Sequence, residues 1–102
     1  MTDASAVRRL ALALPGAVEQ DHHGFPSFRV KGRIFATLPD EHHLHVMLDP
    51  ESIREAVAID PRACEEKWWG AKLAALRISL PDVDETVALG LVEEAFRRKL
   101  QR

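Results

Sequence analysis

Four segments of the chain alternate between apolar and polar residues, and this alternation predicts strands of one sheet. The segments are residues 27–31, 33–38, 43–48 and 75–80, the last being the end of an expected strand over residues 73–80. Alternation puts the following residues on one face, which we expect to be buried: Phe28, Val30, Ile34, Ala36, Leu38, Leu44, Val46, Leu48, Leu76, Ile78 and Leu80. The other face is polar, cationic and rich in histidine, and it holds Ser27, Arg29, Lys31, Arg33, Phe35, Thr37, His43, His45, Met47, Arg77 and Ser79. This second face is the first place to look for a ligand site.

Three further segments carry apolar residues at helical spacing. The first covers residues 3–14, where Thr2 or Asp3 can cap the helix and Pro15-Gly16 ends it. The second begins at Asp49-Pro50, because aspartate caps a helix and proline suits its first position. It ends at residues 60–61, and the third helix runs from residues 81–85 to about residue 100.

The remaining segments are short. Residues 18–22 are expected to form a strand and residues 23–26 a turn. Lys31-Gly32 indicates a hairpin, for which a two-residue loop and a bulged three-residue loop both fit. Residues 62–72 are expected to be irregular or helical, with Trp69 buried and Trp68 partly exposed.

Strands clustered between helices predict an α+β fold, in which an antiparallel sheet carries its helices on one face. A chain of 102 residues suffices for one core, so we expect a single domain over residues 1–102. That core should join the first and last helices to the sheet through Val7, Leu10, Leu14, Phe28, Ile34, Val46, Ile78, Leu91 and Phe96.

Composition narrows the classes of function. A net charge of −2 argues against a strongly electrostatic nucleic-acid binder, whose domain is usually basic, although a local patch can override the total. Cys64 is the only cysteine, which excludes an intrachain disulfide and fits a reducing cytoplasm. The N-terminus does not resemble a signal peptide, and no apolar run reaches the roughly 18–20 residues of a membrane span. We therefore expect a cytoplasmic protein without a membrane segment.

The cationic residues of the polar face are the main candidate site. Arg29, Lys31, Arg33 and Arg77 can contact phosphates, while Phe35 and the tryptophan pair can stack on bases. A solvated face explains the same residues, because lysine and arginine also prevent sheets from associating edge to edge.

Catalytic and metal chemistry is not expected. His43 and His45 share a strand face at a spacing that can chelate, but no placed anionic ligand completes a zinc site. Glu65 and Glu66 follow Cys64 directly and disfavour a reactive thiolate there. No nucleophile and base pair is apparent, so we expect no enzyme, no metal and no cofactor.

Several motifs occur in a recognisable order. They are Leu14-Pro15-Gly16-Ala17 after the first helix, residues 28–36, Lys67-Trp68-Trp69, and Leu80-Pro81-Asp82 before the last helix. In these motifs and their order, nearly the whole chain resembles the MmcQ/YjbR family. The resemblance implies a CyaY-like (frataxin-like) α+β fold. It also implies DNA binding by a double wing, in which a curved antiparallel sheet presents two β-wings, and it implies no catalytic residue.

We therefore predict a DNA-binding protein of the MmcQ/YjbR type, which binds weakly and in a salt-sensitive way through the cationic face. The expected nucleic-acid-binding residues are Arg29, Lys31, Arg33, Phe35, Trp68 and Arg77. The alternative is an adaptor domain that binds a protein or small ligand on the same face, with Met47, Phe35 and Trp68 as its apolar contacts.

Overall fold

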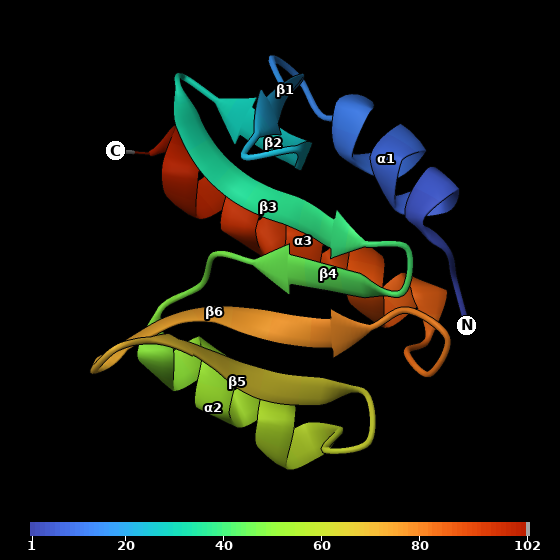
Figure 1. Cartoon of the computed structure of the whole chain (residues 1–102), viewed down its shortest axis with the longest axis vertical. Coiled ribbons are helices and arrows are strands. Elements are labelled where there is room, and N and C mark those ends of the chain that lie inside the picture. Colours follow the sequence, from blue (N-terminus) through green and yellow to red (C-terminus); the bar gives the residue numbers. More distant parts are fainter. Residues whose placement is uncertain (102) are drawn as a thin grey trace.

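The computed structural model describes residues 1–101, which form a six-stranded antiparallel sheet with three helices on one face (Figure 1). The elements are α1 (Ala4–Leu12), β1 (Val18–His22), β2 (Phe25–Val30), β3 (Arg33–Asp40), β4 (His43–Val46), α2 (Pro50–Ile59), β5 (Cys64–Trp69), β6 (Lys72–Ser79) and α3 (Glu85–Leu100). The strands lie side by side in the order β1-β2-β3-β4-β6-β5. The predicted α+β fold is confirmed. No helix in residues 1–101 is long and apolar enough to cross a membrane.

Aspartate side chains cap these helices. Asp3, Asp49 and Asp84 accept hydrogen bonds from backbone N–H groups in the first turn of α1, α2 and α3. Pro50 occupies the start of α2, where its missing N–H costs nothing. The helix starts predicted at Asp3 and at Asp49-Pro50 are therefore confirmed.

Tight two-residue turns connect four of the strand pairs. Lys31-Gly32 links β2 to β3 with positive φ at both residues (53° and 77°), as a type I′ hairpin turn requires. The two-residue alternative for this loop is thus the correct one. His23-Gly24 makes the same kind of turn between β1 and β2, so Phe25 and Pro26 belong to β2 rather than to the turn.

Residues 64–69 form a strand, so the irregular or helical structure predicted for this segment is wrong. β5 lies at the edge of the sheet and pairs with β6 alone. Its charged and aromatic side chains are mostly exposed on both faces, which gives a sequence without apolar alternation. An edge strand of this kind leaves no periodic signal in the sequence.

The core lies between the sheet and the helices. α3 packs across β2, β3 and β4, α2 covers β5 and β6, and α1 packs against α3. Seven of the predicted core residues are buried or pack against the core: Val7, Leu14, Phe28, Val46, Ile78, Leu91 and Phe96. Leu10 and Ile34 are only partly buried and lie outside this cluster, so the prediction is wrong for both.

A β-bulge in β3 explains why Ile34 is not in the core. Phe28 pairs with Ala36 but Arg29 pairs with Ile34, so Phe35 is an extra residue in the ladder. The Phe35 side chain turns toward the helices, where it is fully buried and meets Phe96 edge-on at a centroid distance of 5.5 Å. Ile34 comes to the open face and Arg33 to the helix face, the reverse of the predicted alternation.

The bulge predicts unequal effects of two adjacent truncations. Phe35→Ala should lower the free energy of unfolding by about 3–5 kcal/mol, because it empties the space of a buried ring. Ile34→Ala should cost roughly 1 kcal/mol, the typical effect of a single substitution, because this side chain is partly exposed. Urea denaturation of the two variants measures both values. A larger loss for Ile34→Ala would show that β3 follows the simple alternation and has no bulge here.

Candidate functional site

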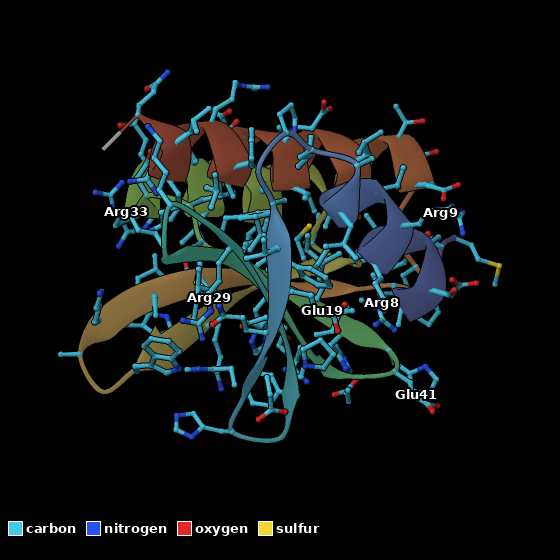
Figure 2. All side chains as sticks on the ribbon, turned by 90° about the horizontal axis from the view of Figure 1, so that it is seen from above. Arg8, Arg9, Glu19, Arg29, Arg33 and Glu41 are labelled. Atoms are coloured by element: carbon cyan, nitrogen blue, oxygen red, sulfur yellow. The ribbon has the colours of Figure 1, made fainter. Side chains whose placement is uncertain are left out.

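A groove with a volume of about 790 Å³ lies on the open face of the sheet. His22 and Phe25 of the β1–β2 hairpin form one wall, and Trp69 and Lys72 of the β5–β6 hairpin form the other. Figure 2 shows the β1–β2 hairpin extending from the sheet on the side away from α3. The floor comes from β3 and from β4 with the residue after it: Ile34, Thr37, His45 and Met47. The volume falls within the range of about 300–1,000 Å³ that is typical of ligand sites.

Cationic side chains outnumber carboxylates in this groove. Among residues 1–101 its lining holds the cationic residues Lys67, Lys72, Arg98 and Lys99, whereas Asp49 is the one acidic residue. The Asp49 carboxylate lies 3.9 Å from Arg98 Nε, and it caps α2 by accepting the Ser52 N–H, which holds the pKa of Asp49 below its usual range. Within residues 1–101, neither Lys67 nor Lys72 forms an ion pair. The groove therefore has a positive excess in a chain whose net charge is −2.

Arg77 lies beside the groove, but its charge is compensated. Its Nε is 3.1 Å from Glu65 Oε1, and its Nη2 is 4.0 Å from Asp40 Oδ2. Its Nη1 lies 2.9 Å from His45 Nε2. Because a guanidinium only donates hydrogen bonds, Nε2 must accept, which leaves the imidazole proton on Nδ1. Arg77 thus orients His45 in the groove floor and is a poorer phosphate ligand than the two free lysines.

His45 is held neutral by its surroundings. Burial disfavours the imidazolium most, and the nearby charges of Arg77 and Lys67 add to this, which lowers the pKa of His45 to about 4. The side chain is buried, with 8% of the residue exposed. At neutral pH it therefore contributes a hydrogen-bond acceptor to Arg77 and no positive charge to the groove.

The two tryptophans point to opposite faces of β5. Trp69 lines the groove and is 56% exposed, so its predicted burial is wrong. It ends an edge strand on the face that no helix covers. Trp68 is 44% exposed, which confirms its predicted partial exposure, but it lies on the helix side, where Nε1 donates to Glu66 Oε1 at 2.9 Å. Of the two tryptophans, Trp69 and not Trp68 is therefore the one that lines the groove.

The other predicted site residues do not form one strip. Arg29 lies on the open face, and its Nε donates to Ser27 Oγ at 3.2 Å. Lys31 is exposed in the β2–β3 turn. Figure 2 shows Arg33 beside the end of α3, where its Nη1 donates to the Lys99 carbonyl at 3.0 Å. The predicted open-face positions of Arg33 and Phe35 are wrong, because the bulge turns both side chains toward the helices.

Four lysine and arginine side chains of the groove are not among the residues predicted from the sequence: Lys67, Lys72, Arg98 and Lys99. Trp69 was considered for stacking as one of the tryptophan pair, but it was expected to be the buried member. The groove joins the β5–β6 hairpin to the C-terminal end of α3, and alternation within single strands does not report such a junction. One signal was present in the sequence. Lys67 and Trp69 lie two residues apart, and Gly70 (φ +59°) begins a two-residue turn that puts Lys72 opposite Trp69.

Other reactive side chains are engaged or protected. His43 Nδ1 lies 3.0 Å from Asp40 Oδ1, and the His42 N–H holds the pKa of Asp40 below its usual range. Burial, with a smaller effect of Asp60, raises the pKa of the Cys64 thiol to about 11. The thiol is thus protonated at neutral pH, for a different reason than the adjacent glutamates expected from the sequence. Among the described residues no group of three or more His, Cys, Asp or Glu is arranged to hold a metal.

Comparison with known families shows the family to which this chain belongs. The family model YjbR matches residues 12–98. The chain belongs to the YjbR family. The matched residues run from the end of α1 to near the end of α3, so both walls of the groove lie within the YjbR region.

A solved structure shares the fold of this YjbR chain. The crystal structure of the Deinococcus radiodurans protein DR2400, with a domain of the family model DUF419, is similar with a TM-score of 0.78. The sequences are 19% identical, and the similarity covers 94% of this chain and 77% of that one. No curated protein gives a significant match. The structural similarity supports the fold and leaves the groove's function to its own chemistry.

His45 predicts a pH dependence of stability. Its folded pKa is about 4 and its ordinary value is 6.5, so between these values the unfolded chain binds more protons and stability falls as the pH is lowered. From pH 7 to pH 4.5 this residue should cost the fold about 2 kcal/mol. Denaturant unfolding of the wild type and of His45→Gln, which keeps an acceptor for Arg77, measures the effect. An equal loss in both proteins would contradict a buried neutral His45.

Proposed function

We propose that this YjbR-family chain binds nucleic acid through the groove between its two hairpins. The observation that carries the proposal is the group of cations in the groove, in particular Lys67 and Lys72, which form no ion pair with a carboxylate of residues 1–101. Arg98 adds a guanidinium at the end of the groove, where its Nη1 donates to the Met47 carbonyl at 3.4 Å. Phosphate groups are the common anions that such a row of lysine and arginine side chains contacts in nucleic acids.

The shape of the site supports the proposal. The β1–β2 and β5–β6 hairpins stand on either side of the groove, which fits the double-wing arrangement that the family resemblance implies. Arg29 lies on the open face of β2 next to Ile34 and can extend the contact along this wall. Arg77 has a structural role in this scheme, because Glu65 and Asp40 compensate its charge.

The binding should be weak and largely independent of sequence. Phosphate contacts carry no sequence information, and three or four of them correspond to the non-specific range, with Kd values of about 10⁻⁴–10⁻⁶ M. Carboxylates close to the groove, and the net charge of −2, weaken the attraction further. We further propose that the protein is a cytoplasmic binding protein rather than an enzyme, since its one cysteine is a buried free thiol and His45 is held by Arg77.

An adaptor domain is the second candidate. The apolar part of the groove lining favours it, since Ile34 and Met47 line the groove together with Trp69. Of the apolar contacts expected from the sequence only Met47 lines the groove, because Phe35 is in the core and Trp68 is on the helix side. An acidic peptide would suit the same cations, and its binding in the absence of any oligonucleotide binding would favour this candidate.

The salt dependence of oligonucleotide binding tests the proposal. For three phosphate contacts, a plot of log K against log salt should have a slope of roughly −2 for a single strand and −3 for a duplex. Lys67→Gln and Lys72→Gln should each flatten the slope by somewhat less than one unit and weaken all sequences alike. Fluorescence anisotropy with a labelled oligonucleotide, at a series of salt concentrations, measures these slopes.

Arg54→Gln is the matched control, because Arg54 is an exposed residue of α2 and does not line the groove. It should leave both affinity and slope unchanged. The proposal fails if neither single-stranded nor duplex DNA binds at protein concentrations near 10⁻⁴ M in low salt. It also fails if Arg54→Gln weakens binding as much as the two lysine variants do.

A further inference from the structure

Trp69 lies in the groove between two lysines on one face of the β5–β6 hairpin. Lys67 precedes it by two residues on β5, which puts both side chains on the same face at a spacing of about 6.6 Å along the strand. Lys72 is its direct partner on β6, across the turn that begins at Gly70. Directly opposed residues have Cβ atoms about 4.5–5.5 Å apart. An exposed indole thus lies between two lysine side chains on the same face of the hairpin.

This arrangement matches the chemistry of a nucleotide. An aromatic side chain offers a surface on which any base can stack, and adjacent cations contact the phosphates on either side of that base. Apolar side chains also line the groove, since Ala74 follows Lys72 on β6 and Ile34 and Met47 lie on the floor.

The size of the groove selects an unpaired base over a base pair. Its volume of about 790 Å³ is that of a site for a small molecule, and bases within a duplex present only their edges, not their faces. A duplex laid on the sheet would also approach the carboxylates of Asp40 and Glu65, which lie on the open face around Arg77. A single strand can place an unpaired base in the groove without approaching Asp40 and Glu65.

We propose that the groove binds single-stranded nucleic acid in preference to duplex, with one unpaired base stacked on Trp69 and its phosphates contacted by Lys67 and Lys72. This inference rests on the proposed function and names the form of nucleic acid that the site takes. The recognised unit is a base with its phosphates, which either a strand or a free mononucleotide supplies. The neighbouring cations Arg98 and Lys99 extend the site in the direction of α3, which favours a strand of several nucleotides.

The two adjacent tryptophans provide a matched pair of variants. Both are exposed, but Trp68 lies on the other face and bonds to Glu66, so it should not contact the strand. Trp69→Ala should weaken binding of a labelled 12-nucleotide single strand by about 5- to 150-fold, the range for loss of one stacked base. Trp68→Ala should leave the affinity unchanged within twofold. Trp69→Phe, which keeps an aromatic face, should retain most of the affinity.

Tryptophan fluorescence gives an independent readout on the same variants. Trp68→Ala retains Trp69 as its one indole, so the single strand should quench its fluorescence, whereas Trp69→Ala should show no quenching. Circular dichroism and a thermal midpoint near that of the wild type confirm that each variant is folded.

Four ligands separate the possible outcomes: the single strand, the same strand annealed to its complement, an abasic strand of equal length, and thymidine monophosphate. The single strand should bind tightest, and the abasic strand should bind like the duplex or more weakly. If the monophosphate binds more tightly than the single strand, the site is one for a free nucleotide, and the proposal that it binds a strand is wrong. Equal or tighter binding of the duplex, or an unchanged affinity of Trp69→Ala, would overturn the inference and leave nucleic-acid binding in place. If none of the four ligands binds, both proposals fail.

Discussion

The bulge at Phe35 determines what each face of the sheet can do. One extra residue in β3 sends the Phe35 ring into the core against Phe96 and turns Ile34 to the open face. The same step sends Arg33 to the end of α3, where it donates to the Lys99 carbonyl. Helix packing, the apolar floor of the groove and the position of one predicted phosphate ligand therefore all follow from one irregularity in the ladder. Bulges commonly redirect side chains in this way next to functional sites.

The groove is lined by three parts of the chain: the end of α3, the β5–β6 hairpin and the start of α2. In each part, the residues that line the groove also stabilise or position the local structure. Cationic residues in the last turn of α3 are stabilised by the partial negative charge of the helix C-terminus, and two of them, Arg98 and Lys99, line the groove. The Gly70 turn brings Lys72 opposite Trp69. Asp49 caps α2 and lies near Arg98, so the carboxylate that lines the groove among residues 1–101 already stabilises the fold. Within the described part of the chain, Lys67 and Lys72 of the β5–β6 hairpin form no ion pair, and this excess of positive charge in the groove is the basis of the proposed function.

Much of the fold follows from the sequence because its signals are local. Capping by Asp3 and Asp49, the Lys31-Gly32 turn, and alternation in β4 and β6 all depend on residues within a few positions of each other. Two features do not follow. The bulge depends on whether a Phe35 ring fits against Phe96, which is about sixty residues away in the sequence. β5 is an edge strand with exposed side chains on both faces, so it has no apolar period to detect.

The candidate site was predictable in kind but not in detail. Of the residues predicted for the cationic face, Arg29 lies on the open face of the sheet, whereas the bulge removes Arg33 and Phe35 from it. Arg77 lies there too, but the acids that neutralise it come from β5 and from the end of β3, which the sequence does not place beside it. Family membership, shown by the match to YjbR over residues 12–98, fixes the fold and leaves the choice of ligand to the groove.

Mapping of the contact surface tests the central claim most directly, namely that the groove between the two hairpins is where nucleic acid binds. Amide chemical shifts of the ¹⁵N-labelled protein, followed during titration with a short single-stranded oligonucleotide, report every residue at once. If the groove binds the strand, the largest changes should occur in residues 67–73, at Ile34 and Met47, and at the end of α3 around Arg98. Changes confined to α1, α2 or the Lys31-Gly32 turn, with the β5–β6 hairpin unaffected, would contradict this claim.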